Sequence, residues 1–419
     1  MNRAIESKCR RRQSPALTLG HIYMFLFSLR FSEPLWVVYL RSRGMSLAMV
    51  GLFETIFHIA SLTGEIPTGW IADRFGRKVS LLFGRALSIL SALLMLRVTT
   101  PLGFGLAFAI SAYSYNCHSG AFDALIFDDL KLDGREQEYA RISGRINALY
   151  LIGCSLAAVI GGIVAQRALQ LLYVLGIGVD LVALIMLLPL RERLLPEVRQ
   201  RTAERIDLRR DLRELVRTVT NRTIGGIMLL WAAGGAIAAS FHFYGQSYMR
   251  DLSVPLPVIG IVGMLANLLA VIPSHFAHRI EGRFGNRRPL LVGSFILPAG
   301  VLAAGLLGGG SSAVERWLIV LMVLIVAVAD EALYPLFSSA INTLVPSERR
   351  ATVLSMAGMV FSVVMMVVFP LVGVCGDAVG LRWGFIIIGG GLALGGALAL
   401  LLRTARQRLT AGAPGPPAE

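Results

Sequence analysis

Long apolar segments alternate with short polar ones along the whole chain. Each of twelve segments is about 20 residues or longer, enough for a helix to span the roughly 30 Å hydrocarbon core of a bilayer. The segments show no strand-like alternation, and only helices or closed barrels can satisfy their backbone groups in lipid. The pattern therefore predicts twelve transmembrane helices, at 15–40, 46–72, 79–98, 101–129, 141–166, 169–190, 223–249, 254–278, 289–309, 316–345, 351–376 and 380–402.

Composition supports this fold class, an all-α integral membrane protein. The mean hydropathy is +0.67 and only 16% of the residues are charged, which is too apolar for an ordinary soluble domain. The basic N-terminal tail precedes an apolar segment of full length without a small-residue cleavage site, so we expect a retained helix. The four cysteines form neither a disulfide framework nor a zinc-ligand framework.

The longest polar stretch divides six helices from six. We expect an N-terminal six-helix bundle over 1–190, a basic linker over 191–222, and a C-terminal six-helix bundle with a short tail over 223–419. Leu208, Leu212, Leu215 and Val219 follow helical spacing, which predicts an amphipathic helix at the lipid headgroups. A regulatory site is the alternative, and a solvated connector is the favoured interpretation.

The net charge of +14 would suit nucleic acid if the cations formed one patch, but their distribution follows the membrane. With the N-terminus inside, 30 of the 40 Lys and Arg residues fall on one side of the predicted bilayer. This is the positive-inside pattern, and it predicts that both termini are cytoplasmic. The charge therefore gives no support to a nucleic-acid partner. The cations of that side lie at 1–12, 74–78, 131–141, 191–222, 279–288, 349–350 and 403–408.

The two halves of the chain repeat one another. The sequence DRFGRK at 73–78, after the second helix, returns in altered form as EGRFGNRR at 281–288, after the eighth. The offset of 209 residues that relates Arg74 to Arg283 also relates Arg141 to Arg350. Parallel six-helix repeats are a known transporter plan, in which the ligand lies between the halves near the bilayer midplane. We therefore predict two pseudo-symmetric six-helix bundles.

The sequence GWIADRFGRK at 69–78 resembles the signature between helices 2 and 3 of the major facilitator superfamily, G-x-L-A-D-R-x-G-R-K. It lies in the corresponding loop and on the predicted cytoplasmic side. With twelve helices, a central basic linker and a second degraded copy, the resemblance covers essentially the whole chain. The fold that it implies is the major facilitator fold, and the function is membrane transport.

The resemblance also implies a gating role for this loop, formed by Gly69, Asp73, Arg74, Gly76, Arg77 and Lys78. Gly69 permits close approach of helices, and Gly76 permits the tight turn. Asp73 is expected to meet the positive end of the eleventh helix, and Arg77 to pair with Asp128 or Asp129, latching the outward-open state. A simple anchor of cations at the membrane surface is the alternative. In the second copy Glu281 is one residue out of register and Asn286 replaces Arg77, which weakens the expectation of a second latch.

Polar side chains interrupt several predicted helices. A charged group near the bilayer centre costs about 2.5–3.5 kcal/mol on insertion scales, so each is expected to face the bundle interior. Helical spacing predicts one stripe for Glu54, His58 and Glu65, a pair between Arg30 and Glu33, and a shared face for Asn116 and Asp123. The candidates for a cavity that binds substrate and protons are Arg30, Glu33, Glu54, His58, Glu65, Asp123, His242, Gln246, Asn267, Asp330 and Glu331.

Buried carboxyl groups suit proton coupling because burial disfavours their charged form and alternating access exposes them to one side at a time. We rank Glu331 first as the coupling acid, then Glu33, then Glu54 and Asp123. For each of them a structural salt bridge or interhelical hydrogen bond is the alternative, and the pair of Arg30 and Glu33 is the most open to it.

These observations predict a proton-coupled secondary transporter of the bacterial inner membrane that exports small amphiphilic molecules by antiport. The eleventh-helix region LVPSERRATVLS resembles efflux-type members, although the fifth helix lacks their proline and the fourth lacks their arginine. An uptake symporter remains an alternative, as does a non-transporting sensor or scaffold. No P-loop, G-x-S-x-G or H-E-x-x-H sequence is present, so we predict neither an enzyme nor a cofactor or metal. The expected partners are a small-molecule substrate, protons and lipid, and the expected state is a monomer.

Overall fold

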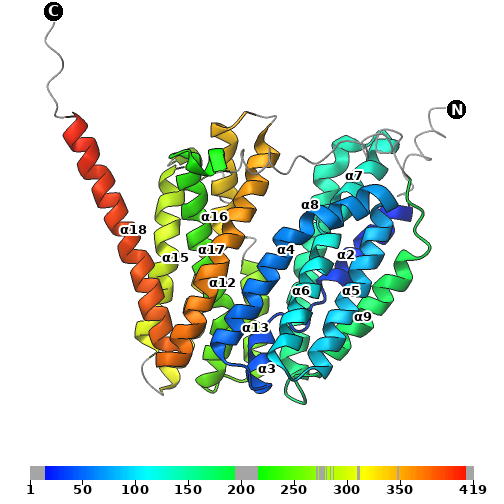
Figure 1. Ribbon diagram of the computed structural model, residues 1–419, viewed down its shortest axis with the longest axis horizontal. Helices are drawn as coiled ribbons and strands as arrows, with labels where there is room; N and C mark the ends of the chain where they lie inside the picture. The colour runs from blue at the N-terminus through cyan, green and yellow to red at the C-terminus, as the bar shows by residue number, and fades with distance from the viewer. Residues whose placement is uncertain are drawn as a thin grey trace, which may run out of the picture.

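The structure is a computed structural model that describes residues 15–193, 216–269, 287–308, 312–346 and 349–411, with isolated positions between 270 and 286. Throughout these residues the regular structure is helical. Figure 1 shows the helices running roughly side by side in two groups, with α2 beginning and α18 ending at the same face of the bundle. We call this face the terminal face and the other the distal face.

The described part of the N-terminal half, 15–193, contains eight α-helical segments. The first predicted helix consists of two segments, α2 and α3, which are separated by residues 29–35. The fourth predicted helix consists of α6 and α7, which meet at Ser119 and Gly120. A short 3₁₀ helix, Glu136–Glu138, precedes α8. The segments are α2 (Pro15–Ser28), α3 (Trp36–Ser42), α4 (Leu47–Phe75), α5 (Arg77–Arg97), α6 (Pro101–His118), α7 (Ala121–Leu132), α8 (Tyr139–Val164) and α9 (Leu171–Leu187).

The C-terminal half is built from longer helices. Prolines lie inside three of them without ending them, at Pro298, Pro335 and Pro370. The described helices of this half are α12 (Ile224–Asp251), α13 (Leu256–Leu269), α15 (Arg287–Leu307), α16 (Ala313–Leu344), α17 (Arg350–Val379) and α18 (Leu381–Ala411). Most of the predicted amphipathic linker, 194–215, lies outside the described residues.

The all-α membrane fold predicted from the sequence is confirmed. Within the described residues, seven helices are long and apolar enough to cross a membrane, and four shorter apolar helices accompany them. The pieces α6 and α7 together occupy the fourth predicted segment. This arrangement is consistent with the twelve predicted spans.

Two of the predicted helices are not continuous, and here the prediction was wrong. Residues 29–35 are not helical, so Arg30 and Glu33 do not share a helix face as expected. Pro34 contributes to this break because it disfavours the helical conformation at Glu33. In the fourth helix, Gly120 has a φ of 71°, a left-handed conformation that ends α6 and redirects α7. The helical spacing that placed Asn116 and Asp123 on one face therefore does not apply.

The halves are packed together toward the distal face. Helix α4 packs on α17, and α8 packs on α13. A Cβ at Gly162 in α8 would lie 3.1 Å from the Cα of Gly260 in α13, so this crossing depends on the absence of side chains. Toward the terminal face, the halves diverge (Figure 1).

Candidate functional site

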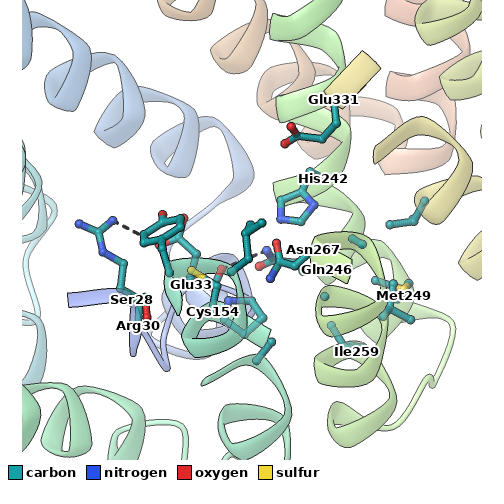
Figure 2. A pocket seen from close by; sticks show the side chains of 18 residues that line it. Ser28, Arg30, Glu33, Cys154, His242, Gln246, Met249, Ile259, Asn267 and Glu331 are labelled. Carbon is teal, nitrogen blue, oxygen red and sulfur yellow. Dashed lines mark hydrogen bonds and ion pairs between the residues drawn. The ribbon is translucent and has the colours of Figure 1, made fainter. Parts of the chain in front are cut away.

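A cavity of about 260 Å³ lies between the two halves. Its walls come from the 29–35 segment and α8 of the N-terminal half, and from α12, α13 and α16 of the C-terminal half. Figure 2 shows Arg30 and Glu33 on one side and His242 and Glu331 on the other. Six of the predicted cavity residues line it together, namely Arg30, Glu33, His242, Gln246, Asn267 and Glu331.

The unwound segment brings the charged pair of the N-terminal half into this cavity. Arg30 Nη1 lies 3.9 Å from Glu33 Oε2, and their side chains are 37% and 50% exposed. The guanidinium also lies over the rings of Phe27 and Tyr115. A long and half-exposed ion pair contributes little to stability, so Glu33 is free to exchange partners.

Helix α12 supplies the floor of the cavity on the distal side. Gln246, which is 3% exposed, donates a hydrogen bond from Nε2 to the backbone carbonyl of Glu33 at 3.1 Å. This contact joins the two halves through the unwound segment. Gln246 Oε1 is buried and has no hydrogen-bond partner among the described residues. Leaving such an acceptor unpaired costs about 1–3 kcal/mol.

A second cavity adjoins the first. Arg30 and Glu33 line both cavities, and Glu54 lines only the second. Glu54 Oε1 lies 3.6 Å from His58 Nε2, one turn along α4, so these two residues share the predicted stripe. The two cavities are therefore lined by three carboxylates, those of Glu33, Glu54 and Glu331, and by one guanidinium, that of Arg30.

The remaining candidates lie elsewhere. Glu65 lines a pocket nearer the terminal face, between α4 and the α6–α7 break, and Asp123 lines another pocket beside α8. Asp330 is directed toward Gly235 of α12, where an added Cβ would lie 3.7 Å from its Oδ1. None of the three lines the central cavity. Glu65 lies two turns along α4 from His58 and lines a different pocket from Glu54.

The α4–α5 turn has the ion pair that the family resemblance implied. Arg77 Nη1 lies 3.0 Å from Asp128 Oδ2 at the end of α7, and both side chains are 12% exposed. Gly76, with a φ of 99°, forms the turn between α4 and α5. Asp129 pairs with Arg193 instead, at 2.5 Å. A Cβ at Gly69 would meet no atom within 4 Å, so the close helix approach expected there is not present in this state.

Asp73 is exposed and makes no hydrogen bond or ion pair with any residue that the structure describes. It lines the same pocket as Ser355 of α17. In the second copy of the loop, Glu281 Oε1 accepts a hydrogen bond from Ser339 of α16 at 2.6 Å. This bond joins the second copy of the loop to α16.

Sequence reasoning missed the acid that caps α5. The carboxylate of Glu192, just after α9, accepts hydrogen bonds from the backbone N–H groups of Arg77 at 2.8 Å and Lys78 at 3.0 Å. The side chain of Lys78 donates to the carbonyl of Leu188 at 2.7 Å. An acid at a helix N-terminus satisfies otherwise unpaired donors and the helix dipole. The linker thus begins by fastening α9 to the α4–α5 turn.

Polar contacts between the halves at the distal face were also missed. Arg41 Nη1 at the end of α3 lies 2.7 Å from Asp251 Oδ1 and 2.6 Å from Ser247 Oγ, both in α12. Asp377 at the end of α17 caps α4, accepting from the backbone N–H groups of Leu47 at 2.9 Å and Ala48 at 2.8 Å. These contacts close the distal face. The sequence could not predict the cap formed by Asp377, because its partners are backbone N–H groups and these leave no signal in the pattern of side chains.

A buried pair lies inside the N-terminal half. Arg85 of α5 lies 2.7 Å from Asp180 Oδ1 of α9, with side chains 4% and 12% exposed. Neither residue was among the candidates chosen from the sequence. No group of three or more metal-ligating side chains occurs in the described part of the chain.

Fold and site together define a helical membrane protein with a central cavity between its two halves. A sequence profile described as Major Facilitator Superfamily matches residues 20–325 and 248–418. The chain therefore belongs to this superfamily, as predicted, and is a multi-pass membrane protein and a secondary transporter of this type.

Curated relatives are distant. An uncharacterized MFS-type transporter, YxaM, of Bacillus subtilis (strain 168) is 22% identical over 85% of this chain and 88% of its own length. A folate-like transporter of Dictyostelium discoideum is 24% identical over 70% of this chain. The match spans about half (50%) of that protein's length. The transporter relatives favour a non-enzymatic role.

Solved structures share the fold at low identity. A variant of the nucleoside transporter NupG superposes with a TM-score of 0.78 at 15% identity, covering 92% of this chain and 99% of that one. A D-xylose–proton symporter superposes with a TM-score of 0.66 at 14% identity, covering 91% of this chain and 95% of that one.

Proposed function

We propose that the protein exports small amphiphilic cations in exchange for protons by alternating access. The observation that carries this proposal is the charge of the central cavities, where Glu33, Glu54 and Glu331 outnumber Arg30. A carboxylate that binds a cation cannot hold a proton at the same time. Competition between substrate and proton for one group couples their movements in opposite directions.

The proposed direction also uses the topology predicted for the chain. We take the terminal face to be cytoplasmic because of the positive-inside pattern, with both termini inside and a bacterial inner membrane as the location. The contacts of Arg41 and Asp377 then close the outer side, and the structure is an inward-facing state that receives substrate from the cytoplasm. Protons that enter down their gradient would displace the cation to the outside.

Arg30 supports a second candidate, uptake by symport. An anionic substrate would bind Arg30 in place of Glu33, and protonation of Glu33 would then favour binding of the anion. Proton and substrate would move together, as in the D-xylose–proton symporter that shares the fold. The excess of carboxylates makes this the weaker candidate.

The test uses proteoliposomes with an acid lumen and a pH dye inside, to which lipophilic cations and organic anions are added in turn. We expect the cations to cause protein-dependent proton efflux, beyond the signal of protein-free vesicles. Protons that move in the same direction as an added anion would establish symport instead. If no compound in the panel moves protons, proton-coupled transport of these compounds is excluded.

A further inference from the structure

The second cavity differs from the central cavity in its aromatic walls. It has a volume of about 170 Å³ and adjoins the central cavity at Arg30 and Glu33. Among the described residues that line the central cavity, Tyr150 is the one with a Phe, Tyr or Trp ring. The two cavities therefore suit chemically different parts of a ligand. The second cavity is lined by five such residues, namely Trp36, Phe57, Phe108, Tyr173 and Phe243.

Three of these rings meet at steep angles. The ring centroids of Phe108 and Phe243 each lie 5.4 Å from that of Trp36, and their planes are inclined to the indole by 59° and 63°. Rings that line one cavity at such angles enclose it like adjoining walls. Phe243, in α12, is the one described residue of the C-terminal half in this lining. The aromatic wall is therefore complete only while the halves are in contact here.

One acid of the second cavity lacks a basic partner. The side chain of Glu54 is 13% exposed and makes no hydrogen bond with any residue that the structure describes, and its Oε1 lies 3.6 Å from His58 Nε2. Arg30 also lines the cavity, but it is paired with Glu33, and its guanidinium lies over rings that line other pockets. Glu54 is therefore without a guanidinium or ammonium partner in the described part of the chain.

The hydrogen-bonding groups of the wall do not select one kind of cation. The hydroxyl groups of Ser32, Ser111 and Tyr173 can donate or accept, and the indole N–H of Trp36 can donate. The Ser91 hydroxyl already donates to a backbone carbonyl at 2.8 Å. An ammonium ion with N–H groups is strongly hydrated and needs an acceptor for each donor once it leaves water. Aromatic rings instead attract a cation through their faces, and sets of such rings bind quaternary ammonium groups in proteins.

We propose that the second cavity binds the charged group of the transported cation, and that this group is a nitrogen bearing alkyl groups in place of N–H donors. The rings of Trp36, Phe108 and Phe243 contact the alkyl groups, and Glu54 balances the charge. The rest of the ligand extends into the adjoining central cavity. This inference rests on the proposed function, in which the cavities bind cations.

The test is a binding series with one aromatic body and a graded number of N–H donors. Benzylammonium and its N-methyl, N,N-dimethyl and N,N,N-trimethyl derivatives are titrated into the purified full-length protein in nanodiscs, at a neutral pH at which all four are cations, with empty nanodiscs as the blank. We expect the trimethyl ion to bind about fivefold or more tightly than benzylammonium. A trimethyl ion that binds no better than benzylammonium would overturn the inference but leave cation binding in place. Absence of binding across the series would overturn the proposed function as well.

Variants locate the preference in the aromatic wall. Phe243→Leu removes a ring and retains an apolar side chain, so the trimethyl ion should lose about fivefold in affinity while benzylammonium changes less. Phe108→Leu should have the same effect from the N-terminal half, and Phe243→Tyr, which retains the ring, should retain the preference. Phe83→Leu replaces a ring of α5 that is 44% exposed and lines neither cavity, so this matched control should bind like the wild type.

The charge of the cavity is tested separately. Glu54→Gln keeps the shape and removes the charge, so it should weaken both ions and leave the ratio of their affinities unchanged. Unchanged affinity of both ions in Glu54→Gln would exclude this cavity as the site of the charged group. A preference for the trimethyl ion that persists in both Phe243→Leu and Phe108→Leu would contradict the assignment to these rings. The wild-type series decides the preference for alkyl groups even if a variant does not fold.

Discussion

At the scale of single residues, Glu331 is the acid that most directly tests proton coupling. Its carboxylate is exposed to the central cavity from α16, where it faces the wall formed by Arg30 and Glu33 (Figure 2). Glu331→Gln keeps the shape and removes the ionisation, so proton movement driven by substrate should be abolished. Exchange of labelled substrate for unlabelled substrate should persist in part, because it needs no net proton transfer. Both are measured in the same proteoliposomes.

The neighbouring acid provides the comparison for Glu331→Gln. Asp330 is directed toward α12 and does not line the central cavity, so Asp330→Asn should retain proton coupling. If Glu331→Gln remains fully coupled, Glu33 becomes the first candidate. Loss of coupling in Asp330→Asn alone would place the proton site outside the cavity described here.

Several residues of the site could be found from the sequence because a charge or an amide in an apolar segment is conspicuous. Glu33, His242 and Glu331 were found in this way, and they line one cavity. What the sequence could not supply was the pairing. The bond from Gln246 to a backbone carbonyl and the pair of Arg85 with Asp180 depend on how separate helices meet. Neither partner carries a local signal for the other.

At the scale of elements, helix existence could be predicted, but helix continuity could not. Pro34 lies in the break of the first helix, yet Pro67, Pro335 and Pro370 lie inside helices that continue through them. A proline in a membrane helix is tolerated when neighbouring groups satisfy the freed backbone. Tertiary packing therefore decides which proline ends a helix. From the sequence alone, Pro34 in the break that places Arg30 and Glu33 in the cavity could not be distinguished from the prolines inside continuous helices.

Two acids near the α4–α5 turn have different surroundings, Asp128 of α7 and Asp73 of α4, and this separates folding from gating. Asp128 is mostly buried beside Arg77, so Asp128→Asn should lower the free energy of unfolding by roughly 1–3 kcal/mol, since it leaves a buried guanidinium without its partner. Asp73 is exposed and has no partner among the described residues in this state. Asp73→Asn should therefore leave thermal stability unchanged and reduce flux, if Asp73 binds the end of α17 only when the terminal face closes. Thermal unfolding and initial transport rates measure the two effects, and undiminished flux in Asp73→Asn would refute the latch.

At the scale of the whole molecule, we propose that the two halves use the same physical device at opposite faces. Asp377 caps α4 at the distal face in the structure, and in this proposal Asp73 caps α17 at the terminal face in the alternative state. A carboxylate at a helix N-terminus binds two or more backbone donors and the helix dipole at once, and it releases them by rigid-body separation. Alternating access is then an exchange of the Asp377 cap for the Asp73 cap. The equilibrium between the two states depends on the difference in free energy between these two caps.

This exchange predicts that weakening the distal cap shifts the resting population. Asp377→Ala removes two charge-assisted hydrogen bonds, of about 1.5–3 kcal/mol each at most, so the distal-open state should gain roughly tenfold or more in population. Spin labels at Thr99, between α5 and α6, and at Val379, the last residue of α17, report the separation of the halves at this face. The population with the longer distance between the labels should increase in Asp377→Ala. It should remain as in the wild type in Glu136→Ala, which removes an exposed acid near the terminal face. An unchanged distance distribution in Asp377→Ala would mean that Arg41 and the apolar contacts around α4 and α17 hold the face closed without the cap.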